Sequence, residues 1–319
     1  MKAIVQDTYG SPDVLELKDI DRPEPGEGEV LVRVAAAGVD PGVWHLLSGL
    51  PYALRLMGFG LRAPKVRVRG RDVAGTVEAV GASVTRFRPG DAVFGISEGS
   101  FAEYTCAPED RFVAKPDGLS FEEAAAVPIS ALTALQAVRA GRVTSGKRVL
   151  IIGAAGGVGS FAVQLARSAG AHVTGVCSTG KVDLVRSLGA DEVVDYTRSG
   201  LGSGYDVILD TAGNRPLSLL RRSLTPAGTL VIVGGEGGGR LLGGVDRVLR
   251  ASLLSLFVRE RLVGLFSRER LVDLEFLRSL VGDGSLRVVI DRSFPLVAAS
   301  AAVVYVHGGH CAGKVVVTV

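Results

Sequence analysis

A glycine-rich turn is the part of this sequence best suited to bind a ligand. It lies in the run IIGAAGGVG, at 151–159, between an apolar segment that predicts a strand and a segment that predicts a helix. In that context Gly156 lets the backbone approach a dinucleotide pyrophosphate, and Gly159 lets the helix pack on the strand, while Ala154 stands where a first glycine is usual. N–H groups at the helix start then bind the anion. The residues predicted to line the site are Ala155, Gly156, Gly157, Val158 and Gly159.

Two polar residues after the next predicted strand indicate which dinucleotide the site takes. In an NAD-specific site, an Asp or Glu near the end of this strand accepts hydrogen bonds from the ribose 2′-hydroxyl. Here the strand expected at 172–177 is followed by Ser178 and Lys181, a hydroxyl and a cation. Because a 2′-phosphate needs donors and positive charge, these residues predict NADPH as the cofactor. The alternative is that Lys181 is an ordinary surface lysine at a helix start.

A third polar feature is the segment 62–71, which carries five cationic side chains in ten residues. Charge clusters are usually solvated, so a surface rim is the expectation and anion binding is the alternative. The net charge is only +3, too weak and too dispersed to predict a nucleic-acid partner. The five cations are Arg62, Lys65, Arg67, Arg69 and Arg71.

The glycine turn belongs to a region in which short apolar strands alternate with longer helical stretches. This alternation begins near residue 120 and predicts βαβ units with a parallel sheet. Within 158–169 apolar residues recur at helical spacing, so one face of that helix is expected to pack on the sheet. Six strands suit a doubly wound Rossmann sheet. They are expected at 148–153, 172–177, 192–195, 206–210, 229–233 and 261–266.

The flanking regions have a different, β-rich texture. Up to about residue 110, glycine and proline separate short β-rich runs such as 29–35 and 73–80. After about residue 267, a helical segment leads to strands expected at 287–290 and 314–319, so we expect the chain to return to its first domain. The expected domains are a substrate domain at 1–124, a dinucleotide-binding domain at 125–266, and the return to the substrate domain at 267–319.

Composition restricts the remaining possibilities. Of 319 residues, 47% are hydrophobic and 22% are charged, which is an ordinary globular balance. No apolar run approaches the ~18 residues that span a bilayer, and the first residues, MKAIVQ, predict a strand rather than a secretion signal. The three cysteines are too far apart for a disulfide framework or a paired metal site. We therefore expect a soluble, cytoplasmic protein, and a homodimer is left open.

Several motifs resemble those of a known family over essentially the whole chain. Besides the glycine turn, they are GRDVAGTVEAVG at 70–81, RFRPGDAVFG at 86–95, LTALQAV at 132–138, LGADEVVDY at 188–196 and the ending HCAGKVVVTV. The sequence resembles the medium-chain dehydrogenase/reductase superfamily, in its zinc-lacking, quinone-oxidoreductase-like branch. The resemblance implies an α/β protein with a GroES-like substrate domain, a Rossmann domain and a cleft between them. It also implies NADPH contacts from Ser178, Lys181 and Tyr196, from Thr133 near the nicotinamide, and from the backbone of Gly234, Leu265, Phe266 and His310.

The same resemblance allows zinc binding to be judged residue by residue. A catalytic zinc needs three protein ligands and a structural zinc four, with Cys and His the usual donors. Where zinc-containing relatives carry Cys and then Gly-His-Glu, this chain reads Gly38-Val39-Asp40 and Gly70-Arg71-Asp72. Between residues 90 and 120, Cys106 is the only cysteine. The sequence therefore predicts no metal site and disfavours metal-assisted alcohol oxidation.

The substrate side is less well specified by the sequence. Tyr52 is the preferred donor to an acceptor oxygen, and Asp40 and Trp44 are further candidates for lining the cleft. Relatives usually carry Val-Asn-Pro-x-Asp where this chain reads Val39-Asp40-Pro41-Gly42-Val43, so an acid replaces an amide and a valine replaces a carboxylate. A loop carboxylate and a packing aromatic are the alternative interpretations of Asp40 and Tyr52.

The predicted function is NADPH-dependent hydride transfer, without zinc, to a quinone or an α,β-unsaturated carbonyl compound. Such acceptors delocalise the charge that hydride transfer creates, so orientation and a few donors can suffice. An enoyl reductase of polyketide or lipid biosynthesis would share this chemistry on another substrate. A non-catalytic NADPH-binding protein is a second alternative, because a fold and a cofactor site do not guarantee turnover. A peripheral membrane role for the Leu-rich segment 241–266 is a third.

Overall fold

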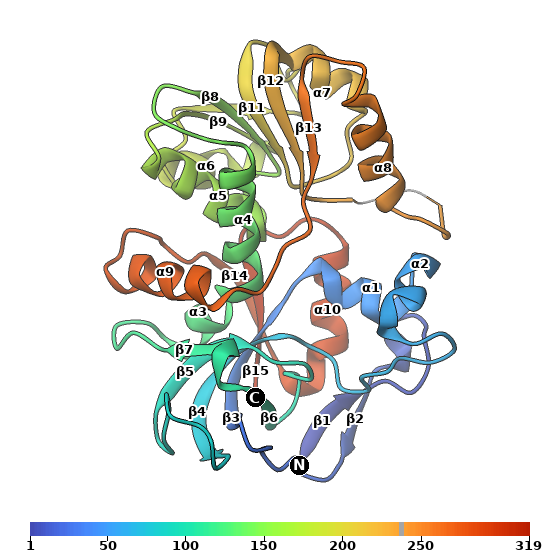
Figure 1. Cartoon of the computed structure of the whole chain (residues 1–319), viewed down its shortest axis with the longest axis vertical. Helices are drawn as coiled ribbons and strands as arrows, with labels where there is room; N and C mark the ends of the chain where they lie inside the picture. The colour runs from blue at the N-terminus through green and yellow to red at the C-terminus, as the bar shows by residue number, and fades with distance from the viewer. Residues whose placement is uncertain (236–238) are drawn as a thin grey trace. The chain divides into compact units, whose positions relative to one another are not determined.

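Residues 1–235 and 239–319 are described in the computed structural model, in which the chain divides into two compact units. The first unit comprises Met1–Leu132 and Glu269–Val319, and the second comprises Thr133–Arg268. Figure 1 shows strands throughout the first unit and a helix-flanked sheet in the second. The domain boundaries expected from the sequence, after residues 124 and 266, lie eight and two residues before these divisions, which follow Leu132 and Arg268.

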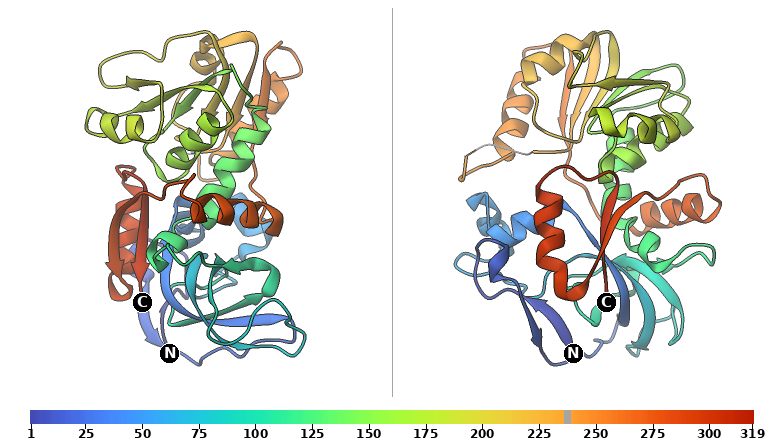
Figure 2. Two further views of the ribbon diagram at one scale, coloured as in Figure 1. Left: turned by 90° about the vertical axis from the view of Figure 1, so that its left-hand side faces the viewer. Right: turned by 180° about the vertical axis from the view of Figure 1, so that it is seen from behind.

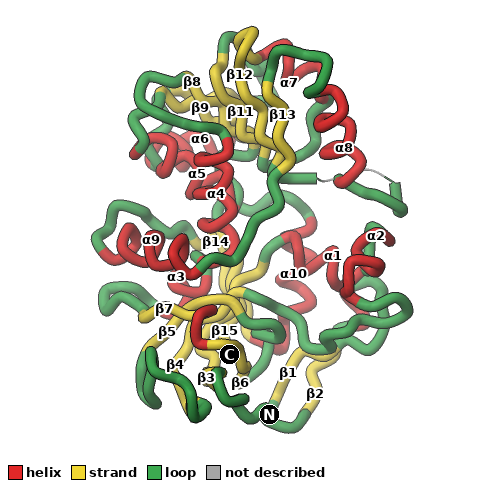
Figure 3. The backbone as a smooth tube through the Cα atoms, in the orientation of Figure 1, coloured by secondary structure: helices red, strands yellow, loops and turns green. Residues whose placement is uncertain are grey.

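The second unit is a six-stranded parallel sheet in the order β10-β9-β8-β11-β12-β13. The chain starts inside the sheet at β8, leaves to one side through β9 and β10, and then crosses to the other side. This is the doubly wound Rossmann order, so the predicted fold class is confirmed. Opposite directions of winding place α5 and α6 on one face and α7 and α8 on the other, as Figure 3 shows. The strands are β8 (Arg148–Ile152), β9 (His172–Cys177), β10 (Glu192–Asp195), β11 (Tyr205–Asp210), β12 (Leu224–Ile232) and β13 (Arg261–Gly264).

Burial on both faces explains why these strands are apolar along their length. Val149–Ile152 of β8 are all buried, as are Val207–Asp210 of β11, which is the pattern of a parallel sheet covered by helices on each side. Helix α5 buries Phe161, Ala162 and Leu165 against the sheet, as the helical spacing predicted. The helices of this unit are α5 (Gly157–Ser168), α6 (Val182–Ser187), α7 (Leu217–Ser223) and α8 (Val245–Leu254).

The first unit is built on a sheet in the order β14-β15-β3-β4-β5-β7, in which β6 also pairs with β3, and on a separate pair, β1 and β2. All pairings are antiparallel except that of β14 with β15. The strands are β1 (Lys2–Val5), β2 (Glu16–Asp19), β3 (Glu29–Val39), β4 (Asp72–Val80), β5 (Ala92–Ile96), β6 (Tyr104–Pro108), β7 (Phe112–Ala114), β14 (Ile290–Pro295) and β15 (Lys314–Thr318). The helices are α1 (Pro41–Ser48), α2 (Tyr52–Leu54), α3 (Phe121–Ala125), α9 (Leu271–Gly282) and α10 (Ala299–His307), and α4 (Pro128–Ala140) crosses into the second unit.

The end of the chain completes the sheet of the first unit. Strand β15 pairs with β3, with Val315 opposite Val39, and α10 packs beside β15 in both views of Figure 2. The strand expected at 287–290 is wrong, because β14 begins only at Ile290. Before that point Val289 accepts one hydrogen bond from Lys314 N, at 2.8 Å, and regular pairing with β15 starts at the next residue. No helix in the described part of the chain is long and apolar enough to cross a membrane.

Candidate functional site

Most of the residues expected to bind the cofactor follow strand ends at one edge of the parallel sheet. All six strands run in the same direction, so their carboxyl ends meet at one edge, where open α/β sheets bind ligands. Strand register supports this, since Ile152 of β8 lies opposite Val176 on one side and Asp210 on the other. The candidate residues that follow these strand ends are the glycine turn after β8, Ser178 and Lys181 after β9, Tyr196 after β10, Gly234 after β12, and Leu265 and Phe266 after β13.

The glycine turn has a shape that only glycine permits at its key positions. Gly153 has a φ of 81°, which disfavours residues with a side chain. A Cβ atom on Gly159 would lie 2.0 Å from the carbonyl oxygen of Gly153, so this residue sets how closely α5 approaches β8. By contrast, a Cβ atom on Gly156 would meet only that same oxygen, at 3.3 Å, so the space beyond Gly156 is open.

The start of α5 offers the donors that a dinucleotide pyrophosphate requires. The helix begins at Gly157, and its N-cap residue, Gly156, has no side chain to bond the first N–H groups. Helical geometry leaves these N–H groups without an intrahelical partner, and the helix dipole adds positive charge at the same place. The open space and the unpaired donors therefore fit a bound nicotinamide dinucleotide at its phosphates.

The end of β9 carries Ser178 and Lys181 beside an acidic residue that the sequence interpretation passed over. Asp195 ends β10 and lies opposite Cys177 in register. Its carboxylate accepts hydrogen bonds from the hydroxyls of Thr179, at 2.5 Å, and Thr197, at 2.7 Å. These bonds lower the pKa of Asp195, so the carboxylate is ionised and already bonded to neighbouring loops. The motif LGADEVVDY includes Asp195, but the motif does not show that β10 pairs with β9 so that Asp195 lies opposite Cys177.

Two arginines at the same edge were also missed. Arg215 lies 5.3 Å from the ring centroid of Tyr196, whose side chain is 48% exposed. Arg247 of α8 forms a buried ion pair with Asp210 at the end of β11 and donates to the carbonyl of Arg215 at 2.9 Å. Burial raises the pKa of Asp210, although the charge of Arg247 opposes that shift. The pair thus fixes α8 against the point where the strand order reverses, between β8 and β11.

The three substrate-side candidates all belong to the first unit. Asp40 is the N-cap of α1, and its Oδ1 accepts a hydrogen bond from Gly42 N at 2.7 Å. Trp44 stacks on His307 of α10, with ring centroids 3.5 Å apart. Tyr52 begins α2, is 41% exposed, and has the guanidinium of Arg55 at 4.8 Å from its ring centroid.

Two remaining candidates fall at other positions in the fold. Thr133 is half-buried in α4, at the start of the second unit. His310 is exposed and belongs to the first unit, in the loop between α10 and β15. Their expected contacts with the cofactor stay predictions.

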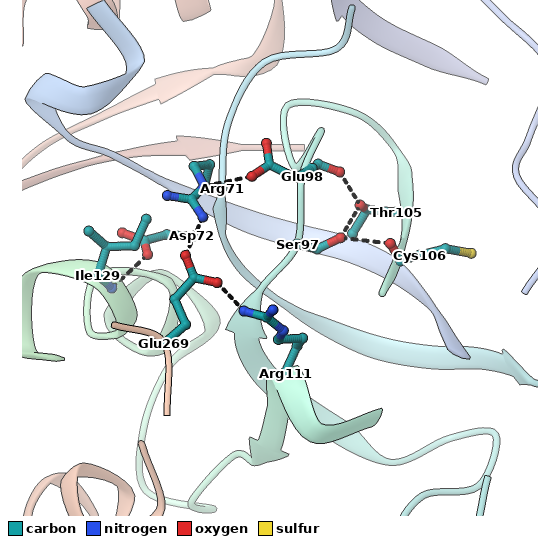
Figure 4. Close-up of polar contacts among 9 residues, drawn as sticks. All are labelled: Arg71, Asp72, Ser97, Glu98, Thr105, Cys106, Arg111, Ile129 and Glu269. Atoms are coloured by element: carbon teal, nitrogen blue, oxygen red, sulfur yellow. Dashed lines mark hydrogen bonds and ion pairs between the residues drawn. The ribbon is translucent and has the colours of Figure 1, made fainter. Parts of the chain in front are cut away.

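The basic segment 62–71 is not a uniform solvated rim. Three of its cations are exposed as expected, but Arg69 is 4% exposed and its burial lowers its pKa. Arg71 is half-buried: its Nε donates to Glu98 at 2.9 Å and its Nη2 to Glu269, as Figure 4 shows. The expectation is therefore wrong for these two residues, because carboxylates and backbone from elsewhere in the first unit enclose them.

Beside this cluster the first unit has a small pocket. It encloses about 10 Å³ next to Arg111 and Glu269, enough for about one water molecule and not for an organic acceptor. Within residues 1–235 and 239–319, no group of three or more His, Cys, Asp or Glu side chains comes together that could hold a metal ion.

Comparisons with known proteins add to these observations. Residues 26–117 match a family model described as an alcohol dehydrogenase GroES-like domain, and residues 188–317 match one described as a zinc-binding dehydrogenase. The chloroplastic quinone-oxidoreductase homolog of Spinacia oleracea is 33% identical over 336 residues, which cover 99% of this chain and 98% of that protein.

Two solved structures are similar over the whole chain. The quinone oxidoreductase from Coxiella burnetii has a TM-score of 0.86 and 30% identity, with 100% of this chain and 99% of that chain covered. A mycobacterial protein solved in complex with NADPH has a TM-score of 0.84 and 28% identity, with full coverage of both chains, 100% each.

Proposed function

Because this chain belongs to the quinone-oxidoreductase-like branch of the medium-chain dehydrogenase/reductase superfamily, whose members are nicotinamide-dependent oxidoreductases, we propose that it reduces a quinone or an α,β-unsaturated carbonyl compound with NADPH. The observation that carries the proposal is the glycine turn before α5, with its open space, its unpaired N–H groups and its place at the carboxyl edge of a Rossmann sheet. Bound there, NADPH would supply a hydride.

The chain's own groups bind and orient the two reactants. The N–H groups of Gly157, Val158 and Gly159 would hold the pyrophosphate, since they open the helix without a capping side chain. Ser178 and Lys181 would meet the 2′-phosphate with a hydroxyl and a positive charge. Their position directly after β9 supports this role, because the ribose of a dinucleotide lies at the end of that strand in a Rossmann sheet.

The proposed class of acceptor follows from the chemical groups of the substrate-side residues. A saturated alcohol gives up a hydride only when its hydroxyl is deprotonated, which requires a Lewis acid or a positioned base. The substrate-side residues include an N-cap carboxylate, a stacked indole and an exposed phenol, and none of these forms a proton relay. A quinone or an enone spreads the added charge over a conjugated system, so orientation and hydrogen-bond donors suffice.

Zinc independence is part of the proposal. The chain has Asp40 and Arg71 where zinc-containing relatives carry ligands, and an arginine, which stays protonated, cannot coordinate a metal ion. We therefore expect hydride transfer to proceed without a metal. A cytoplasmic location and a homodimer also stay predictions.

A steady-state screen of the purified protein tests the function. We expect NADPH oxidation with 1,4-naphthoquinone, 1,4-benzoquinone or short enones, and little reduction of NADP⁺ by simple alcohols. Activity should survive incubation with a chelator, and elemental analysis should find no stoichiometric zinc.

Three results would contradict parts of this proposal. Faster oxidation of an alcohol than reduction of every quinone and enone would reject the acceptor class. About one zinc per chain, lost together with activity on chelation, would reject zinc independence. NADPH binding without oxidation by any acceptor would favour the non-catalytic alternative.

A further inference from the structure

Arg71 holds its guanidinium group in a fixed position within the first unit. Its Nε donates to Glu98 and its Nη2 to Glu269, while the other carboxylate oxygen of Glu269 accepts from Arg111 (Figure 4). The planar fork of an arginine lets two such bonds fix the direction of its remaining N–H groups. Burial opposes the charge, but Glu269, Glu98 and Asp40 outweigh it and raise the pKa of Arg71 above its usual value. Arg71 is therefore a permanent and oriented cation.

The Nη1 atom of this guanidinium is available to a ligand. Among the described residues, no hydrogen bond or ion pair engages Nη1 of Arg71. The side chain is 29% exposed, and Nη1 is not among the buried atoms that lack a partner. A ligand that enters from solvent can therefore reach this N–H group.

An unused acceptor lies within electrostatic range of the same guanidinium. The Oδ2 atom of Asp40 is buried and has no hydrogen-bond partner in the described structure, whereas its Oδ1 caps α1. The charge of Asp40 acts on both Arg71 and Asp72, but no N–O distance within 4.0 Å pairs Asp40 with Arg71. A buried carboxylate oxygen without a donor is unfavourable, so a water molecule or a ligand group that donates a hydrogen bond to Oδ2 would stabilise it.

We propose that Arg71 binds the carbonyl oxygen of the acceptor through Nη1, and that Asp40 holds the water molecule that later protonates the product. This inference rests on the proposed reductase function and names the residue that the acceptor's oxygen contacts. Hydride addition at the electron-poor β-carbon of an enone moves the π electrons onto that oxygen, which becomes an enolate anion. Addition at a ring carbon of a quinone likewise gives an enolate, which becomes the phenolate of the hydroquinone when a proton shifts from that carbon to the second carbonyl oxygen. Arg71 stabilises the anion, a proton from water completes the product, and the hydroxide is neutralised by solvent.

Arg71 suits this role better than Tyr52, the donor expected from the sequence. Two ion pairs hold Arg71 before the acceptor arrives, so its N–H group needs no reorganisation during the reaction. Tyr52 is more exposed, at 41%, and its side chain has the guanidinium of Arg55 over its ring. A charged donor also forms a stronger hydrogen bond to an oxyanion than a neutral phenol does.

Binding of 4-nitrophenol to the protein loaded with NADP⁺ tests the inference without turnover. This probe absorbs visible light when ionised, and it resembles the proposed product in having an oxyanion on a conjugated system. We expect the wild-type protein to bind the phenolate and to lower the pKa of the bound probe. Arg71→Met should weaken phenolate binding at least about tenfold and remove that pKa shift, since it removes a charge-assisted hydrogen bond.

A closely matched control is available in the same unit. Arg86 has the same side-chain exposure as Arg71, 29%, and pairs with Glu275 at 2.8 Å. Arg86→Met should leave the affinity and the pKa of the probe unchanged. Asp40→Asn should keep phenolate binding, because an asparagine still caps α1, but should lower kcat several-fold with an enone acceptor.

Kinetics give a second readout. With 1,4-naphthoquinone, Arg71→Met should lower kcat/KM about a hundredfold, mostly through kcat, whereas Arg86→Met should not. If Arg71→Met does not fold, Arg71→Lys is measured instead, and it should retain part of the phenolate affinity.

An Arg71 variant that binds phenolate and turns over like Arg86→Met would overturn the inference and leave the proposed function intact. Absence of NADPH oxidation by the wild-type protein with every acceptor would reject the proposed function, and the probe titration would then show only whether Arg71 binds a phenolate.

Discussion

At the scale of single residues, Lys181 offers the most direct test of cofactor choice. Strand β9 ends without an acidic residue, and Asp195 on β10, which lies opposite Cys177 in register, is engaged by Thr179 and Thr197. We predict that Lys181→Ala weakens NADPH binding by about 1.5 to 3 kcal/mol, because a charge-assisted contact to the 2′-phosphate is lost. NADH binding should change little. Calorimetric titration of both cofactors measures the difference.

Lys147 is a suitable control for that experiment. It is exposed and directly precedes β8, so it lies at the amino edge of the parallel sheet, away from the expected cofactor site. Lys147→Ala removes the same charge and should leave both affinities unchanged. Equal affinity of the wild-type protein for NADPH and NADH would show that Ser178 and Lys181 do not select the cofactor.

Local sequence could identify some of these residues and not others. The glycine turn was predictable because the residues that define it are neighbours in sequence, and so was the polar end of β9. The anchoring of Arg71 was not predictable, because its partner Glu269 is 198 residues away. The sequence showed Arg71 only within a cluster of cations and at a position where zinc-containing relatives carry a ligand. Arg247 was missed for a similar reason, since it pairs with Asp210, 37 residues away, only once the chain has folded.

At the scale of elements, the close packing of α5 on β8 governs the cofactor site. We predict that Gly159→Ala forces the helix and the glycine turn apart, because its Cβ atom would lie 2.0 Å from Gly153 O. The variant should lose about 1 to 3 kcal/mol of stability, as overpacked sites do. It should also lose the rise in melting temperature that NADPH binding gives. Thermal unfolding with and without NADPH measures both effects.

Gly200→Ala is the matching control in the same unit. A Cβ atom on Gly200 would meet nothing within 4 Å, and the residue lies in a loop before β11. This variant should unfold like the wild-type protein and keep the full stabilisation by NADPH. A Gly159→Ala variant that NADPH stabilises as strongly would show that α5 need not approach β8 so closely.

The strands of the second unit were more predictable than those of the return segment. A parallel sheet covered on both faces needs unbroken apolar runs, and such runs are visible in sequence. The strand expected at 229–233 begins later than β12, which starts at Leu224, because Pro226 and Gly228 resemble a turn. The structure accommodates this stretch at a register shift between β11 and β12. The run at 287–290 was apolar too, but pairing with β15 decides where β14 begins.

At the scale of the whole molecule, a buried ion pair joins the last strand of the chain to β4 within the first unit. The Nζ atom of Lys314, in the last strand, donates to Asp72 of β4 and to Ser130 of α4, both at 3.0 Å. The other oxygen of Asp72 accepts from Ile129 N at 2.8 Å. Lys314 is 2% exposed and Asp72 is 0% exposed, so both charges depend on each other for solvation. The pair thus links the returning segment 269–319 to the sheet and to the start of α4.

Because of this dependence, removing one partner should lower the free energy of unfolding strongly, and removing both should lower it much less. We predict that Lys314→Met lowers the free energy of unfolding of the first unit by about 3 to 5 kcal/mol, because it leaves the carboxylate of Asp72 buried without its counter-charge. The double variant Asp72→Leu with Lys314→Met should recover much of the loss. The single tryptophan, Trp44, lies in the first unit, so its fluorescence during denaturant unfolding reports on that unit.

Lys18→Met serves as the control, since it breaks a pair whose side chains are 37% and 46% exposed and should move the midpoint little. If Lys314→Met shifts the midpoint no more than Lys18→Met does, the pair does not hold the returning segment in place, and the apolar contacts of β15 with β3 and α10 must do so alone.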